Sequence, residues 1–322
     1  MRRRHLLTAS VLHLLISPLM AMAQSYPDRP IKILQGFAPG GNADAIARTV
    51  GMEMAKGLGQ SAVVEAQAGA GGTIAATTVS KAKPDGYTLL LATGGHAVAG
   101  ALYNNLAYRT VQDFEMISTI TYFPFLIVVP ANSKYTSLSA LLSAARSNPT
   151  EVSYGSAGIG STQHLSGELL ASLSRTQLLH IPFRGDAAAL TALLGGEIPM
   201  MVAPPTAVMA NIKAGKLKAL ATTGPQRWAG LPEVPTVAEQ GVAGYDVQSW
   251  AGLMAPAGTP RAVVDRLHAE VQKVLAVPAV RSRLEDMGGD VRGSTPEEMR
   301  NLVAQQTQRW VQVINDAKIP KQ

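Results

Sequence analysis

The sequence predicts a two-lobed α/β protein. Its 322 residues exceed the length that one hydrophobic core usually organises, so two lobes are the expected arrangement. Short apolar runs alternate with segments whose apolar residues recur at helical spacing, which is typical of βαβ units and parallel sheets. Aromatic residues make up only 5% of the chain, whereas glycine is abundant with 30 residues. This composition fits an α/β protein with tight turns better than a β-sandwich.

The first 23 residues have the pattern of a cleaved secretory signal peptide. Three arginines at positions 2–4 precede an apolar run over 6–19, and small residues at 21–23 suit a cleavage site. A membrane anchor is the alternative, but His13 and Pro18 interrupt the run, which is also short for a bilayer span. We therefore expect export to the periplasm as a soluble protein, by the general or the twin-arginine route.

The composition excludes several classes of function. Cysteine is absent, which rules out disulfides, thiolate metal sites, a cysteine nucleophile and a lipidated cysteine. Removal of residues 1–23 lowers the net charge from +6 to about +3. No basic cluster with interleaved aromatic residues points to nucleic acid. No later segment is apolar enough to span a bilayer, so a role in transport would require a separate membrane protein.

Strands and helices are predicted to alternate from residue 31 onward. The strands are expected over 31–37, 62–65, 87–92, 151–155, 178–182, 200–203 and 218–222, and the first helix has apolar residues at Ile46, Val50, Met54 and Leu58. An apolar stretch near 117–130 separates two such series. A parallel sheet is therefore predicted on each side of this stretch.

Two C-terminal helices are predicted from their start signals. Thr259-Pro260 and Thr295-Pro296 each place a hydroxyl at the N-cap and proline at the first helical position, and Glu298 completes a capping box in the second helix. The last helix carries an apolar stripe that is expected to pack on a lobe, formed by Met299, Leu302, Val303, Trp310, Val313 and Ile314.

Two glycine-rich loops, each between a predicted strand and helix, are the candidate binding segments. The first contains Phe37, Ala38, Pro39, Gly40, Gly41 and Asp44; the second contains Ser156, Ala157, Gly158, Ile159, Gly160, Ser161, Thr162 and His164. Glycine lets the backbone approach a ligand closely, and the first turn of a helix leaves amides unpaired at the positive end of its dipole. Such loops can hold an anion, with hydroxyls as additional donors. The alternative is two ordinary turns that Asn42 and Ser161 cap.

Asp44 falls in the first turn of the helix after the first loop. A carboxylate there stabilises the helix dipole by about 0.3 to 1 kcal/mol, so capping is the preferred interpretation. Direct ligand contact is the alternative, and it would require a ligand that also carries an ammonium group.

Signals for a cofactor, a metal or catalysis are weak. The stretch Gly69-Ala70-Gly71-Gly72 fails the dinucleotide pattern because Ile74 takes the place of its last small residue, and no phosphate-binding P-loop occurs. Histidines stand singly without metal-ligand spacing. Ser161 and His164 could share a helix face, but no Gly-x-Ser-x-Gly setting surrounds the serine. We expect no cofactor and no metal, and an exported hydrolase using Ser161 and His164 remains an alternative.

Short motifs mark the chain from Tyr26-Pro27 onward. In order, they are Pro39-Gly40-Gly41 with Asp44, Gly69-Ala70-Gly71-Gly72, Pro84-Asp85-Gly86-Tyr87-Thr88, Gly195-Gly196, Leu217-Lys218-Ala219-Leu220-Ala221, Leu231-Pro232-Glu233-Val234-Pro235-Thr236 with Glu239 and Gly241, and Ala257-Gly258-Thr259-Pro260. In order and spacing this set resembles the periplasmic solute-binding receptors of tripartite tricarboxylate transporters, often called Bug receptors.

The resemblance implies a type II-like periplasmic binding protein fold with a ligand cleft between the lobes. It places the first lobe over 24–124, the second over 125–250, and the return crossing with the C-terminal helices over 251–322. It also implies that the two loops hold a ligand carboxylate through amides, hydroxyls and water. We expect a monomeric receptor rather than an enzyme, which delivers a small carboxylate to separate membrane transporter subunits; a sensor of ligand occupancy is an alternative.

Departures from the family pattern concern the ligand. Ala66-Gln67-Ala68 replaces the usual Asn-Arg-Pro, which removes a basic group. In the usual Pro-Tyr-Lys-Gly motif, Phe183 replaces the tyrosine and so lacks its hydroxyl, and Arg184 replaces the lysine. Arg184 offers a planar guanidinium group suited to a carboxylate; the alternative is that it lies on the surface. Strand ends at Thr93, Gly94 and Pro204 are expected to line the cleft. The ligand itself, an organic acid, an amino acid or an aromatic acid, stays open.

Overall fold

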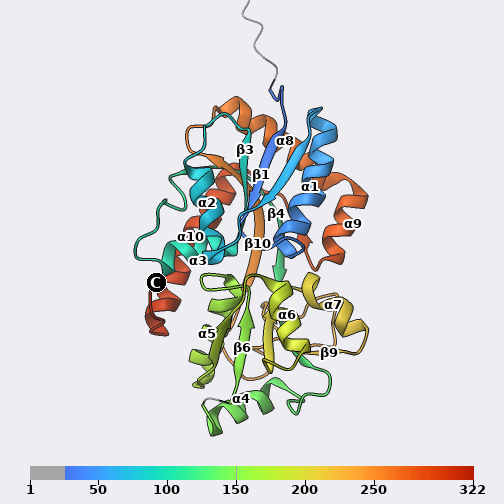
Figure 1. Ribbon diagram of the computed structural model, residues 1–322, viewed down its shortest axis with the longest axis vertical. Helices are drawn as coiled ribbons and strands as arrows, with labels where there is room; N and C mark the ends of the chain where they lie inside the picture. The colour runs from blue at the N-terminus through green and yellow to red at the C-terminus, as the bar shows by residue number, and fades with distance from the viewer. Residues whose placement is uncertain (1–25, 150) are drawn as a thin grey trace, which may run out of the picture.

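The computed structural model describes residues 26–149 and 151–322, which form two lobes joined by extended strands (Figure 1). The signal peptide predicted at 1–23 lies outside the described residues. The upper lobe of Figure 1 begins with β1 (Ile31–Gln35), α1 (Asn42–Leu58), β2 (Ala62–Ala66), the 3₁₀ turn η1 (Ala70–Gly72), α2 (Thr73–Ser80), β3 (Thr88–Thr93), α3 (Gly94–Leu102) and β4 (Phe114–Pro124).

The second lobe follows directly, because Phe125 alone separates β4 from the next strand. Its elements are β5 (Leu126–Pro130), α4 (Leu138–Ser147), β6 (Ser153–Ser156), α5 (Thr162–Ser174), β7 (Leu179–Pro182), α6 (Asp186–Leu194), β8 (Met200–Ala203), α7 (Pro205–Lys213) and β9 (Leu217–Thr222). The chain then returns to the first lobe through β10 (Gln248–Pro256), followed by α8 (Arg261–Ala276), α9 (Pro278–Asp286), β11 (Asp290–Val291) and α10 (Pro296–Asp316).

Each lobe contains one mixed sheet. The strand orders are β11-β4-β10-β3-β1-β2 in the first lobe and β7-β6-β8-β5-β9 in the second. The predicted parallel pairing is confirmed for β1 with β2 and β3, and for β6 with β7 and β8. The strands β5 and β10 belong to the apolar stretch and the return crossing and not to the predicted parallel series, and they pair antiparallel with their neighbours.

The direction of β10 and β5 follows from their role in the chain path. Each is the strand by which the chain enters a lobe from the other lobe, so each starts at the hinge. The parallel strands run the opposite way and end at the hinge, as the pairing of Leu126 with Ala203 and Thr222 shows. The carboxyl ends of both parallel sets therefore face the space between the lobes, which is where ligands bind in open α/β sheets.

The C-terminal helices agree with the prediction in part. Thr295 caps α10, with its side chain accepting from the Glu298 amide at 3.2 Å and the Glu298 carboxylate accepting from the Thr295 amide at 2.8 Å. The predicted Thr259 cap is wrong: Pro260 is the N-cap of α8, because the Thr259 hydroxyl donates backwards to the Pro256 carbonyl at 2.7 Å. The helix α9, which begins at Pro278, was not predicted.

The apolar stripe of α10 packs on the first lobe as expected. Its residues Met299, Val303, Trp310 and Ile314 are buried, and the helix lies against α3 and β4. No helix in residues 26–149 and 151–322 combines the length and apolarity needed to cross a membrane.

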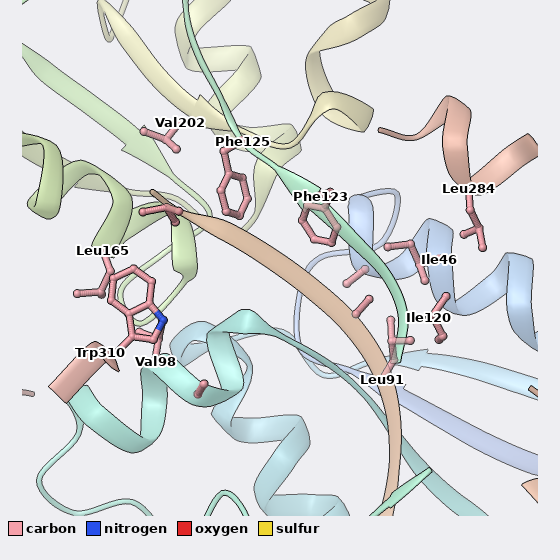
Figure 2. Packing of buried hydrophobic residues seen from close by; sticks show 14 of the residues in the cluster. Ile46, Leu91, Val98, Ile120, Phe123, Phe125, Leu165, Val202, Leu284 and Trp310 are labelled. Carbon is pink, nitrogen blue, oxygen red and sulfur yellow. The ribbon is translucent and has the colours of Figure 1, made fainter. Parts of the chain in front are cut away.

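One hydrophobic cluster continues through the hinge. It joins first-lobe residues such as Ile46 and Leu91 to second-lobe residues such as Val202 (Figure 2). Phe123 and Phe125 lie between these two groups, with ring centroids 5.8 Å apart in an edge-to-face arrangement. Because the aromatic pair belongs to the same cluster as both lobes, the hinge is a packed part of the core.

Candidate ligand site between the lobes

A small pocket lies between the lobes where the parallel strands end. Its volume is about 20 Å³, and its lining comprises Phe37, Asn42, Ala43, Thr93, Phe123, Phe125, Thr162, Gln163, Asp186, Pro204 and Ser249. Two larger clefts adjoin it through shared residues. One of about 700 Å³ shares Phe37, and one of about 410 Å³ shares Asn42 and Asp186. The interlobe space thus consists of a narrow centre with two wider mouths.

Asp44 secures the first loop from within. Its Oδ2 accepts from the Gly40 amide at 3.1 Å and from Arg48 Nε at 2.9 Å. Burial opposes ionisation, but the hydrogen bonds from Arg48 and Gly40 hold the pKa of Asp44 below its usual range. The Oδ2 atom is therefore engaged by its own loop and helix, as the capping interpretation requires, whereas Oδ1 is buried with no hydrogen-bond partner among the described residues.

The second loop is also closed by its own side chains. Ser156 Oγ accepts from the Gly158 amide at 3.1 Å, and His164 Nδ1 accepts from the Gly160 amide at 3.4 Å. Ser161 caps α5 by accepting from the His164 amide at 3.2 Å. The expected cradle of glycine amides is thus already occupied by the chain itself. Among the described residues, the amides of Thr162 and Gln163, at the start of α5, are left without a partner.

Two stacked histidines support the second loop. The rings of His164 and His180 lie 4.1 Å apart at 22°, and Ser156 Oγ is 2.7 Å from His180 Nε2. Burial lowers the pKa of His164 to about 4 and, together with the neighbouring His164, that of His180 to about 3. Both rings are therefore neutral at neutral pH and act as packed polar groups beneath the loop.

The geometry disfavours the serine hydrolase alternative. Ser161 Oγ donates to the Gly158 carbonyl at 2.7 Å and accepts from the backbone of His164, so it is engaged away from the imidazole ring. The serine that does meet a histidine ring is Ser156, which was predicted to line the ligand site and not to pair with His180. Ser156 is fully buried, so a substrate has no access to its hydroxyl.

The lobes touch at two glycines. Gly71, with φ +64°, lies so close to the second loop that a Cβ would be 2.5 Å from the Gly160 carbonyl carbon. Gly160, with φ +81°, faces the ring of Tyr103, where a Cβ would be 3.0 Å away. Both the backbone conformation and the close approach require glycine here. The Gly69-Ala70-Gly71-Gly72 stretch, which fits no cofactor motif, thus forms a contact between the lobes.

Most of the predicted site residues line one of the three spaces. Phe37, Ala38, Ala157, Gly158, Ile159, Phe183 and Arg184 line the cleft of about 700 Å³; Gly40 and Gly41 line the cleft of about 410 Å³; and Phe37, Thr93, Thr162 and Pro204 line the central pocket. Arg184 is exposed and makes no ion pair with any described residue.

The other predicted residues lie outside these linings. Ser156, Ser161 and His164 support the second loop from behind, and Asp44 does so for the first, whereas Gly160 lies at the contact between the lobes. The Gly94 amide donates to Ser249 Oγ at 3.2 Å. Pro39 is exposed at the tip of its loop.

Four polar residues of the central pocket were missed as ligand contacts. Gln163 Nε2 donates to Asp186 Oδ1 at 3.0 Å, and Thr206 Oγ1 donates across the lobes to Asn42 Oδ1 at 3.1 Å. The four missed residues are thus Asn42, Gln163, Asp186 and Ser249 on β10, whereas Thr206 lines the cleft of about 410 Å³. A signal for Asp186 existed, since Gly185-Asp186 begins a helix after β7 just as the two loops do after β1 and β6.

Among the residues that the structure describes, Asp186 is the one ionisable side chain that lines the central pocket. It is 7% exposed, and its carboxylate accepts from Gln163 and from the backbone amide of Asn42. Burial raises the pKa of Asp186 to about 6, and these hydrogen bonds limit the rise. Within the described residues, no group of three or more His, Cys, Asp or Glu side chains is arranged to hold a metal.

The protein has two α/β lobes, and strand ends from both lobes line the cleft between them. This arrangement defines the class of periplasmic binding proteins. A family model described as "Tripartite tricarboxylate transporter family receptor" matches residues 46–319. The UPF0065 protein in the tcbD-tcbE intergenic region of Pseudomonas sp. (strain P51) is 39% identical over 319 residues, which cover 98% of this chain and 95% of that protein.

Comparison with solved structures leads to the same class of protein. The periplasmic binding protein BugD is 36% identical and superposes with a TM-score of 0.88 over 92% of this chain and 100% of that one. MatC (Rpa3494) from Rhodopseudomonas palustris, solved with bound malate, is 36% identical with a TM-score of 0.86 over 90% and 100% of the two chains. The chain belongs to the tripartite tricarboxylate transporter receptor family, and the predicted Bug receptor resemblance is confirmed.

Proposed function

We propose that this protein captures a small carboxylate between its lobes in the periplasm. The observation that carries the proposal is the central pocket, in which the N-terminal turns of α1 and α5 from opposite lobes meet. Helix N-termini favour anions through free amides and the helix dipole. Thr93, Thr162 and Ser249 add hydroxyls to the same lining. The bound malate of the related MatC structure supports the carboxylate class.

Delivery to a membrane transporter is the second part of the proposal. The family description names a transporter receptor, and the described helices include none that could span a bilayer. Passage across the membrane would therefore depend on separate subunits. Closure of the lobes around ligand gives those subunits a shape to recognise.

A ligand screen tests the proposal. Small molecules released from the purified protein on unfolding would be identified by mass spectrometry, and a panel of carboxylates would be tested by thermal shift. A ligand at one hundred times its dissociation constant should stabilise the fold by about 2.7 kcal/mol. The matched control is the primary amide of each hit, which keeps the carbon skeleton but lacks the carboxylate.

Two results would contradict the proposal. The first is a panel in which no carboxylate stabilises the protein more than its amide. The second is steady chemical conversion of a hit that Ser161→Ala abolishes, which would favour the hydrolase alternative. Binding without turnover is the expected outcome.

A further inference from the structure

Asp186 is a buried acid at the centre of the proposed ligand site. It is the first residue of α6, follows Gly185 with φ +109°, and lines both the central pocket and the cleft of about 410 Å³. Gln163 and the Asn42 amide together supply two hydrogen bonds to its carboxylate. A carboxylate has about four acceptor positions, so Asp186 can accept more.

In residues 26–149 and 151–322, no cationic side chain lines the central pocket with Asp186. Arg48 is bound to Asp44, and Arg184 lies in the cleft on the other side of the pocket. Arg283 lines the cleft of about 410 Å³, but within the described residues no ion pair joins it to Asp186. Within the described part of the chain, the negative charge of Asp186 is therefore met by neutral donors, Gln163 and the Asn42 amide.

A buried carboxylate without a counter-ion is costly, and a cation close to it removes part of that cost. The raised pKa of Asp186 has the same cause, because burial disfavours its charged form. A second carboxylate near Asp186 would repel it. The site thus combines two helix N-termini that favour an anion with one acid that favours a cation.

We propose that Asp186 accepts hydrogen bonds from a primary ammonium group of the ligand, so that this receptor selects small amino acids over the same acids without the amino group. The inference rests on the proposed function, since it names the ligand class of that site. The helix N-termini would hold the ligand carboxylate, and Asp186 would hold its ammonium group.

Calorimetry on matched ligand pairs tests this inference. Ligand-free full-length mature protein would be titrated at pH 7.5 with aspartate and succinate, glutamate and glutarate, alanine and propionate, and phenylalanine and 3-phenylpropionate. In the pair that binds best, the amino acid should bind about tenfold or more tighter than its deamino partner, the scale of one hydrogen bond to a charged group.

The variant Asp186→Asn removes the charge at nearly constant volume. It should reduce the amino acid preference to about threefold or less, while the deamino acid binds as well as before or better. Glu197→Gln is the matched control, because Glu197 is an exposed acid just beyond the other end of α6. That variant should keep the full preference.

The outcomes separate the two proposals. Equal binding of both members of every pair, or an unchanged preference in Asp186→Asn, would overturn the role of Asp186 and leave carboxylate binding intact. Failure of every acid in both series to bind the wild-type protein would contradict the proposed function, and the inference would fall with it.

Discussion

Asp186 shows how a single residue can serve binding at the expense of stability. Its carboxylate is buried between the lobes with two neutral donors, and no cation from the described residues pairs with it. Ionisation of a buried acid without a counter-ion costs more free energy than ionisation of an acid exposed to water. Functional sites commonly retain such groups because the ligand supplies the missing partner.

The cost predicts a pH-dependent effect of Asp186→Asn on the ligand-free protein. The folded pKa of about 6 lies above the ordinary unfolded value of about 3.9. The neutral carboxyl thus contributes fully to stability below about pH 4, and that contribution is lost as pH rises through about 6. The variant should therefore raise the free energy of unfolding by about 1 to 3 kcal/mol at pH 7.5 and by little near pH 4.

Urea denaturation at a series of pH values would measure this difference. The buried histidines are present in both proteins, so their titration cancels in the comparison. Glu197→Gln, which removes an exposed acid, should show no pH-dependent gain. A stability difference that stays constant from pH 4 to 7.5 would mean that packing, and not charge, explains the effect of Asp186→Asn.

At the scale of elements, the glycine stretch of η1 sets how closely the lobes approach. Gly71 and Gly72 both have positive φ, so alanine is strained at either position. A Cβ at Gly71 would lie 2.5 Å from the backbone of Gly160 in the other lobe, whereas at Gly72 the nearest atom outside its chain neighbours would be 3.8 Å away. Of the two substitutions, only Gly71→Ala would therefore push a side chain against the opposite lobe.

We therefore expect Gly71→Ala to weaken ligand binding by about tenfold or more, because closure would require the backbone to move. Gly72→Ala is the matched control, and it should lower thermal stability while leaving affinity near the wild-type value. Calorimetry and small-angle scattering with saturating ligand would measure affinity and closure. Equal affinity loss in both variants would show that backbone strain, and not contact between the lobes, is responsible.

The elements also show what the sequence can and cannot predict. Hydrophobic periodicity located the seven strands that it predicted to within about two residues, and the capping box located the start of α10. Periodicity records which face of a strand is apolar but not its direction, so it could not reveal that β5 and β10 run against their neighbours. The start of α9 was missed because Pro278 follows Val277, which offers no capping hydroxyl.

The same limit applies to the site. The glycine-rich loops were recognisable because each is a continuous stretch of the sequence with a characteristic composition. Asp186 was missed because its surroundings include Asn42 of the opposite lobe, and Gln163 because its partner Asp186 lies 23 residues further along the chain. Likewise, no local pattern could show that Ser156 and His164 would occupy the amides of their own loop.

For the whole molecule, the packed hinge means that the lobes are mechanically coupled. Phe123 and Phe125 belong to a cluster that contains residues of both lobes (Figure 2). We therefore expect opening and closing to preserve this contact, as a rotation about the aromatic pair would and a separation of the lobes would not.

The cellular location of the whole chain gives a further prediction. Cleavage after Ala23 should yield a mature protein that begins at Gln24 and appears in the osmotic-shock fluid of cells that express it. Mass spectrometry of the intact protein would give the mass of the mature chain. Recovery of an uncleaved chain in the membrane pellet would favour the anchor alternative instead.

The position of β10 determines the order in which the molecule can be assembled. β10 lies between β3 and β4, yet it is synthesised after the entire second lobe. The sheet of the second lobe draws all its strands from residues 126–222, so it can be completed first. Until residue 256 is available, β3 and β4 are left as open strand edges, the kind of surface that promotes association between unfinished chains. Newly made protein is therefore most vulnerable to aggregation in its N-terminal half, although that half is made first.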